Sequence, residues 1–228
     1  GSISKKLEKN ALNWADQITV PSKEMFQEYV KNGYKVSYVP NAIDISSFSH
    51  DKDRRYEKQL IFAGRLSKEK GILDLLNFLK ILSKDIHLII LGSGPEESKV
   101  KDMTRTFPNL HFLGYQSKEN TIKLIRGSDI LIQPSIMEGG TSSTLLEAMA
   151  CKIPIIATSV DGNKDTIIHM KTAYVVSSNN PSEIHNAVNY LFNNPEKEEI
   201  IINNAYELVS NYDWEQIGQK YLDVYNSI

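Results

Sequence analysis

The sequence predicts an α/β fold built on a doubly wound parallel sheet. From about residue 60 onward, short runs rich in Ile, Leu and Val alternate with amphipathic stretches of helical period. No two of these runs are close enough to form a hairpin, and most are apolar throughout, as buried parallel strands are. With 228 residues, 41% of them hydrophobic and 24% charged, the chain can bury a full core.

The expected elements of this region follow in order. Strands are predicted at 59–63, 87–91, 110–113, 129–133, 153–157 and 173–176. Helices are predicted between them at 71–82, 96–107, 117–126, 142–151 and 181–192, and Pro181 suits the first turn of the last of these. Two more helices, 195–210 and 214–226, close the chain, and Asp213 is the expected N-cap of the second.

The first 45 residues differ from the rest. A helix at 3–15, a strand at 17–20, a helix at 22–32 and a strand at 36–39 make one βαβ-like unit, too small to bury a core alone. Residues 46–58 are polar and predict an exposed linker. We therefore divide the chain into residues 1–45, the linker 46–58, a main domain 59–212 and a last helix 213–228. The opening Gly1 and Ser2, without a methionine, indicate an internal fragment.

Charge and cysteine content narrow the classes of function. A formal net charge of −2 gives no electrostatic reason to expect a nucleic-acid partner. The single cysteine, Cys151, cannot form an internal disulfide, and its apolar surroundings favour packing in a reduced compartment. No apolar run approaches the ~20 residues that span a bilayer, and no signal-peptide pattern is present. We expect a cytoplasmic protein, with peripheral contact to the inner face of a membrane left open.

The most informative segment is 134–150, which follows a predicted strand. Ligands bind where parallel strands end, and here Glu138 precedes a glycine pair, a hydroxyl-rich turn and a helix that carries Glu147. Glycines let the backbone approach an anion, and the free N–H groups of a helix N-terminus attract it. The alternative is a capped helix without a ligand, since Thr144 and Glu147 have capping-box spacing. The candidate phosphate-binding residues are Gly139, Gly140, Thr141, Ser142, Ser143 and Thr144.

Three further loops after strands contribute candidates. Arg65 and Lys70, in a loop bounded by Gly64 and Gly71, are spaced to clamp a diphosphate, although a solvated charged turn has the same composition. The next loop holds Gly92 and Gly94 in a compact turn. The third presents Tyr115, which is placed to stack on a nucleobase or to remain a plain surface tyrosine.

Metal chemistry is not predicted. The five histidines show no metal-ligand spacing with one another or with Cys151. Asp51 and Asp53 have the D-x-D form that binds Mn²⁺ or Mg²⁺ in some sugar-nucleotide enzymes, but their polar flanks favour a solvated linker. We expect no metal and no cofactor.

Taken in order, these motifs resemble the C-terminal, donor-binding half of family-four retaining glycosyltransferases of the GT-B fold, a half that is Rossmann-like. The resemblance covers most of the chain and rests on six segments. They are AD at 15–16 with Ser22, PNAID at 40–44 with Phe48, GRL at 64–66 with KG at 70–71, GSGP at 92–95, PS at 134–135 with EG at 138–139, and LEAMA at 146–150.

The resemblance implies a function and roles for these residues. Arg65 and Lys70 would bind the donor diphosphate and stabilise it as the leaving group without a metal, Glu138 would bind the donor sugar, and Glu147 the ribose. The loop glycines, Tyr115 and the amides of 139–144 would line the donor site. The donor would be a nucleotide sugar, a UDP-sugar first and a GDP-sugar next. The acceptor would be a glycan, a glycolipid or a protein-linked glycan, as in polysaccharide biosynthesis.

The chain also departs from the family pattern. Eight residues separate Glu138 from Glu147 where the family has seven, and the segment DGNKD at 161–165 stands where a double glycine followed by glutamate is usual. Only the last unit of the acceptor-binding N-terminal domain is present, so the missing domain is an expected partner, toward which the last helix crosses back. The fragment alone is expected to bind donor without catalysing transfer. A non-catalytic sugar-nucleotide binding module and a GT-B nucleotide-sugar epimerase remain alternatives.

Overall fold

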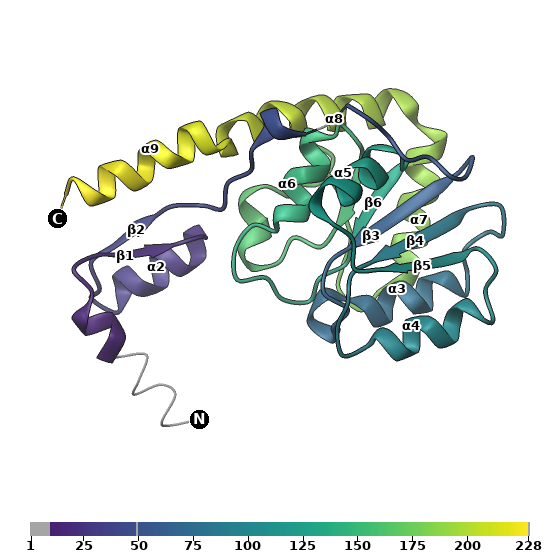
Figure 1. Cartoon of the computed structure of the whole chain (residues 1–228), viewed down its shortest axis with the longest axis horizontal. Helices are drawn as coiled ribbons and strands as arrows, with labels where there is room; N and C mark the ends of the chain where they lie inside the picture. Colours follow the sequence, from purple (N-terminus) through teal and green to yellow (C-terminus); the bar gives the residue numbers. More distant parts are fainter. Residues whose placement is uncertain (1–9, 49, 228) are drawn as a thin grey trace.

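The computed structural model describes residues 10–48 and 50–227. Its main body is a six-stranded sheet whose neighbouring strands all pair in parallel, with helices on both faces (Figure 1). The strand order is β5-β4-β3-β6-β7-β8, which confirms the predicted doubly wound α/β sheet. The strands are β3 (Gln59–Ala63), β4 (His87–Leu91), β5 (Leu110–Gly114), β6 (Ile130–Gln133), β7 (Ile155–Ala157) and β8 (Tyr174–Val175).

The helices lie between the strands as the sequence predicts. Those expected at 71–82 and 96–107 end three residues early, because their last residues form single turns. The helices are α3 (Ile72–Leu79), α4 (Glu97–Thr104), α5 (Lys118–Arg126), α6 (Ser143–Ala150), α7 (Pro181–Asn193) and α8 (Pro195–Val209). None of the helices within the described ranges combines the length and apolar character that crossing a membrane requires.

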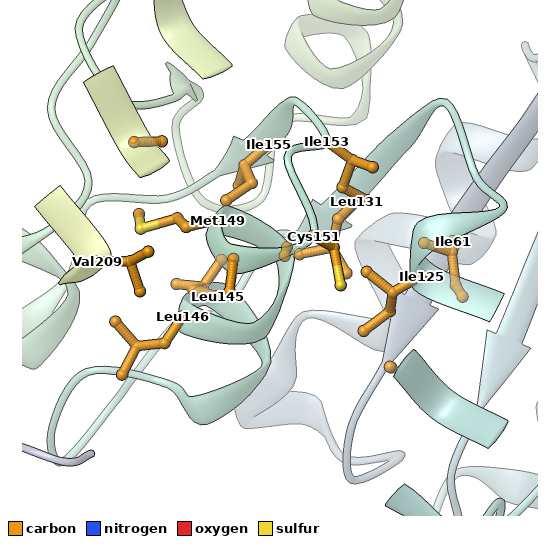
Figure 2. Close-up of a cluster of buried hydrophobic side chains, with 14 of the residues drawn as sticks. Ile61, Ile125, Leu131, Leu145, Leu146, Met149, Cys151, Ile153, Ile155 and Val209 are labelled. Carbon is orange, nitrogen blue, oxygen red and sulfur yellow. The ribbon is translucent and has the colours of Figure 1, made fainter. Parts of the chain in front are cut away.

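Alternate side chains of the buried strands supply two hydrophobic cores, one on each face of the sheet. Leu60 and Phe62 of β3 point to the core under α3 and α7, whereas Ile61 points to the core under α5 and α6. Figure 2 shows the second core, where Leu145, Leu146 and Met149 of α6 pack near Val209 at the end of α8. Both faces are therefore covered, which is why the strands are apolar throughout.

Cys151 lies in this second core, as its flanks predict. Its side chain is 4% exposed, and burial raises the pKa of the thiol to about 11. A thiol held in its neutral form by apolar surroundings is a packing residue and a poor nucleophile.

The N-terminal segment forms the predicted βαβ-like unit beside the main sheet. Strands β1 (Ile18–Val20) and β2 (Val36–Tyr38) pair in parallel and are joined by α2 (Lys23–Lys31). The helix expected at 3–15 falls mostly outside the described residues, but residues 10–14 are helical. The division of the chain into four segments stays a prediction.

The last helix, α9 (Trp214–Tyr225), extends from the main body toward this N-terminal unit (Figure 1). The side chain of Asp213 accepts the backbone N–H of Glu215 at 3.1 Å, which confirms it as the N-cap. It also accepts the N–H of Ile45 at 3.1 Å, and Lys220 lies over the ring of Tyr38 at 5.9 Å. These contacts join α9 and its N-cap to the segment 38–45.

The expected linker is exposed in part and is also tied to the main body. Its Arg54 guanidinium lies 2.7 Å from Asp129, and the Asp53 N–H donates to the Lys123 carbonyl at 2.8 Å. The Asp53 carboxylate pairs with Arg55 at 2.7 Å. Among the described residues, no three His, Cys, Asp or Glu side chains gather in a group that could hold a metal ion.

Three stacked rings near the amino ends of β4 and β5 generate a prediction about pH. The Tyr56 ring lies 4.0 Å from His87 and 4.3 Å from His111, and burial, followed by His87 and Arg55, lowers the pKa of His111. In the unfolded chain the histidine pKa is about 6.5, so the unfolded chain binds a proton at this position more readily than the folded chain does. We expect the free energy of unfolding to fall as the pH is lowered through about 6.5, and less so in His111→Phe.

Urea denaturation of both proteins at pH 7.5 and 5.5 measures this difference. An equal loss of stability in the two proteins would show that His111 does not contribute to the acid sensitivity.

Candidate functional site

Loops that follow three adjacent strands enclose a cleft of about 510 Å³ at the carboxyl edge of the sheet. The strand order reverses direction between β3 and β6, and such a switch point is where open α/β sheets bind ligands. The structure brings many of the predicted site residues together here. The predicted residues that line the cleft are Gly64, Arg65, Gly92, Gly94, Tyr115 and Thr144, and they are joined by Ser93, Gln116 and Thr121.

The floor of the cleft is made of backbone from closely packed loops. Gly92 has φ +124°, and a Cβ there would lie 1.9 Å from the Gly64 carbonyl oxygen, so only glycine fits. The Gly92 N–H donates to Gly114 at 2.8 Å, and the Leu66 N–H donates to Ser93 at 2.9 Å. At Gly64, Gly92 and Gly94 the cleft is therefore lined by main chain, which a ligand group can approach closely.

The rim of the cleft carries two exposed side chains that make no hydrogen bond or ion pair with another described residue. Tyr115 is 79% exposed and lines the cleft. Arg65 is exposed and, within residues 10–48 and 50–227, its guanidinium makes no hydrogen bond or ion pair, although its carbonyl accepts the Ser67 N–H at 2.9 Å. An arginine on the rim with an unused guanidinium is suited to binding a phosphate or carboxylate.

Lys70 lies outside this lining and is paired with Glu138. Its Nζ is 2.5 Å from Glu138 Oε2, and the Glu138 side chain is only 5% exposed. The other carboxylate oxygen accepts from Ser135 Oγ at 2.7 Å and from Gln133 Nε2 at 3.3 Å. The two cations expected to clamp one diphosphate thus have different environments: Arg65 is free, and Lys70 neutralises a buried carboxylate.

The loops after β3 and β6 are held together beneath this pair. The N–H groups of Ile136 and Met137 both donate to the Glu69 carbonyl, at 2.7 and 3.3 Å. Gly71 has φ +70° and its Cβ position would lie 1.9 Å from the Pro134 carbonyl oxygen, so a larger residue would force the loops apart. The positions of Lys70 and Glu138 are therefore coupled through the main chain as well.

The turn after Glu138 is packed between two other segments. Gly140 faces Pro21, whose side chain would lie 2.9 Å from an added Cβ, and it also touches Gly162. Asn41 Nδ2 donates to the Thr141 carbonyl at 2.7 Å. Gly140 therefore allows close packing of protein segments, while Gly139 has open space around it.

Helix α6 begins at Ser143 without a capping side chain. Ser142 is the N-cap, so Thr144 and Glu147, whose spacing suggested the alternative of a capping box, do not form one. The Ser142 Oγ accepts from Gln133 Nε2 at 3.0 Å instead of capping the helix, and the Ser142 N–H donates to Asn163. The first turn of α6, with Thr144 in the cleft lining, keeps N–H groups that no side chain caps.

Glu147 is a partly buried carboxylate with no hydrogen bond or ion pair in the described part of the chain. Burial raises the pKa of this carboxyl group, and the nearby charge of Lys118 opposes the rise. A desolvated carboxylate without a partner lowers the stability of the fold. Such carboxylates are common in binding sites, where a ligand supplies the missing partner.

Four residues of this site were not singled out as site residues from the sequence: Gln133, Ser135, Asp161 and Asn163. Gln133 and Asn163 are 2% and 0% exposed, yet Gln133 Oε1 and Asn163 Nδ2 have no hydrogen-bond partner among the residues that the structure describes. Buried polar groups without partners are rare and need a specific explanation. A polar residue ending an otherwise apolar strand was the available signal for Gln133.

The chain is similar in sequence to known glycosyltransferases. The family model described as "Glycosyl transferases group 1" matches residues 44–208. An uncharacterized glycosyltransferase of Methanocaldococcus jannaschii is 29% identical over 75% of this chain and 45% of the relative. The phosphatidyl-myo-inositol mannosyltransferase of Mycobacterium leprae is 24% identical over 83% of this chain and 53% of the relative. The chain spans about half the length of the curated relatives it matches.

Solved structures share the fold. Anabaena HepE in complex with UDP-glucose superposes with a TM-score of 0.84 at 19% identity, over 96% of this chain and 65% of that chain. Sucrose-phosphate synthase from Thermosynechococcus elongatus gives a TM-score of 0.84 at 21% identity, over 100% of this chain and 63% of that chain.

The pair of Lys70 and Glu138 generates a stability prediction. Lys70→Ala leaves the Glu138 carboxylate buried without its cation, so the free energy of unfolding should fall by about 1–3 kcal/mol. Lys58→Ala is the matched control, because Lys58 precedes β3 and forms an exposed pair with Asp85 at 2.7 Å. Urea denaturation compares the variants, and an equal effect of the two substitutions would contradict the assignment.

For Glu147 we predict that a substitution increases the stability of the fold. Because its pKa is raised in the folded state, ionisation destabilises the fold as the pH rises above the ordinary glutamate range of about 4.3. Glu147→Gln should therefore raise the free energy of unfolding at pH 7, by on the order of 1 kcal/mol. The gain should vanish at pH 4, where both side chains are neutral; a variant less stable than the parent at pH 7 would refute it.

Proposed function

The chain belongs to the glycosyl transferases of group 1, and from that premise we propose that it is the donor-binding half of a retaining, metal-independent glycosyltransferase. Its donor would be a nucleotide sugar, most simply a UDP-sugar, and its acceptor a glycan, a glycolipid or a protein-linked glycan. The observation that carries this proposal is the cleft at the strand switch point, where the free Arg65 lies near the uncapped first turn of α6. Both features favour a bound anion.

The proposed donor pose assigns each part of the ligand to one part of the site. The diphosphate lies between the Arg65 guanidinium and the first-turn N–H groups of α6. The base lies along the backbone floor at 114–116 beside Tyr115, and the ribose hydroxyls supply the partner that Glu147 lacks. The donor sugar extends toward Lys70 and Glu138. The fold shared with HepE, whose structure contains UDP-glucose, supports this pose.

In the proposed reaction, the bond between the anomeric carbon and the donor phosphate oxygen breaks. A bond forms from the acceptor hydroxyl oxygen to the same carbon, and the hydroxyl proton passes to the departing phosphate oxygen, so that the products are a glycoside and a nucleoside diphosphate. Negative charge builds on the departing nucleoside diphosphate, so cations and amides fixed beside it lower the barrier. Arg65 and Lys70 are the two cations proposed for this role.

Residues 1–45 and α9 are proposed to belong to the acceptor side of the enzyme. Trp14 and Trp214 are 84% and 52% exposed, and Leu222 and Tyr225 of α9 are 54% and 69% exposed. Apolar side chains of this size are suited to contact with a further domain. The relatives are about twice as long as this chain, in agreement with such a domain.

Calorimetric titration with UDP, GDP and ADP tests donor binding. We expect UDP to bind, and Arg65→Ala to weaken it about tenfold or more by removing a charge-assisted phosphate contact, with no loss of stability. Lys70→Ala should also weaken binding, whereas the exposed Lys58→Ala should not. Binding of none of the three nucleotides would contradict the proposal, and binding of UDP unaffected by Arg65→Ala would remove Arg65 from it.

A further inference from the structure

A second segment lies along the turn that carries Glu138. It is the 3₁₀ turn Asp161–Asp165, which follows β7, the strand next to β6. Asp161 Oδ2 accepts the Glu138 N–H at 3.1 Å. Further along, the Gly162 carbonyl accepts from Thr141 Oγ1 at 3.0 Å, and Asn163 Oδ1 accepts the Ser142 N–H at 3.1 Å.

The packing between the two segments is as close as the backbone allows. A Cβ on Gly162 would lie 2.2 Å from the Gly140 Cα, so the main chains touch at this point. Residues 161–163 thus run alongside residues 138–142. The side chains of Asp161 and Asn163 accept hydrogen bonds at the two ends of this contact, and Gly162 touches Gly140 in the middle. The eight-residue spacing between Glu138 and Glu147 is accommodated within this supported turn.

Asp161 adopts a backbone conformation that favours glycine. Its φ is +41°, in the left-handed region, which a non-glycine residue adopts at a cost and which Asp and Asn tolerate best. Glycine at this position would avoid the strain. The aspartate provides something that glycine lacks, namely the carboxylate that accepts the Glu138 N–H.

Glu138 is consequently held at both ends. Lys70, Ser135 and Gln133 hold its carboxylate, and Asp161 holds its backbone N–H. A charge-assisted hydrogen bond to the main chain fixes the residue from which the carboxylate extends, and a shift of 1 Å there would change every contact the carboxylate makes.

We propose that Asp161 is a positioning residue for Glu138. Its carboxylate holds the Glu138 backbone so that the Glu138 side chain meets the sugar hydroxyls of the donor. This inference rests on the proposed function, because it assumes that Glu138 faces the donor sugar. It predicts an effect on the sugar part of the donor with little effect on the nucleotide part, since Arg65 lies in the loop after β3 and Glu147 lies in α6.

Two substitutions at one position separate positioning from backbone conformation. Asp161→Gly relieves the left-handed strain and removes the acceptor, whereas Asp161→Asn tolerates the same φ and keeps a side-chain oxygen. In ¹⁵N-labelled protein, we expect hydrogen exchange of the Glu138 amide to speed up at least tenfold in Asp161→Gly and to change less than threefold in Asp161→Asn. Unchanged exchange of the Glu138 amide in Asp161→Gly would show that the Asp161 carboxylate does not hold the Glu138 backbone. Thermal unfolding of each variant checks that it is folded.

Titration with UDP, UDP-glucose and UDP-N-acetylglucosamine tests the consequence for the donor. In Asp161→Gly we expect affinity for the better UDP-sugar to fall about tenfold while affinity for UDP changes less than threefold, with recovery in Asp161→Asn. Equal changes for UDP and the UDP-sugar, or no UDP-sugar bound more tightly than UDP by the parent protein, would overturn the positioning role alone. Failure of the parent to bind any of the three ligands would overturn the proposed function, and with it this role.

Discussion

The contact on which the site depends is the ion pair of Lys70 and Glu138, placed where the order of the strands reverses. The two residues come from loops that follow β3 and β6, which are neighbours in the sheet although the pair lies 68 positions apart in sequence. A carboxylate that is 5% exposed requires such a partner, since an isolated buried charge is costly. The close packing of Gly71 on Pro134 and the hydrogen bonds to Glu69 keep the two loops near enough for the pair to form.

The strands of the sheet could be predicted from the sequence because each of them is marked by a local run of apolar residues. A run such as Leu60, Ile61 and Phe62 is fully buried on both sides of the sheet, so every residue in it is apolar and the run is visible without any partner. Helix ends were less accurate, since the single turns after α3 and α4 continue the amphipathic pattern while most of their hydrogen bonds change to the i→i−3 spacing. The start of α6 was predicted to within one residue, but several hydroxyl residues lie there, and the hydrogen bond from the Ser142 N–H to Asn163 could not be predicted from the local sequence.

The site was predictable in its residue types and less so in its contacts. The loops with Arg65 and Gly92 could be placed at one edge because they follow parallel strands, and the cleft lies there. Pairing of Lys70 with Glu138, and of Gly140 with Pro21 and Gly162, depends on which loops touch across the sheet, and one sequence carries no local signal for that. The aspartate and asparagine that replace the usual glycines were visible as departures, but their hydrogen bonds to the turn were not.

The packing of the N-terminal unit on the Glu138 turn has a mechanical consequence. Pro21 lies against Gly140, Asn41 donates to Thr141 at 2.7 Å, and Lys164 pairs with Glu24 at 3.0 Å, so the turn has protein on both sides. A rotation of the N-terminal unit relative to the main sheet has to move these contacts, and the turn moves with them. A displacement of residues 18–41 would therefore act on the backbone that carries the buried carboxylate through these contacts, without passing through the hydrophobic cores.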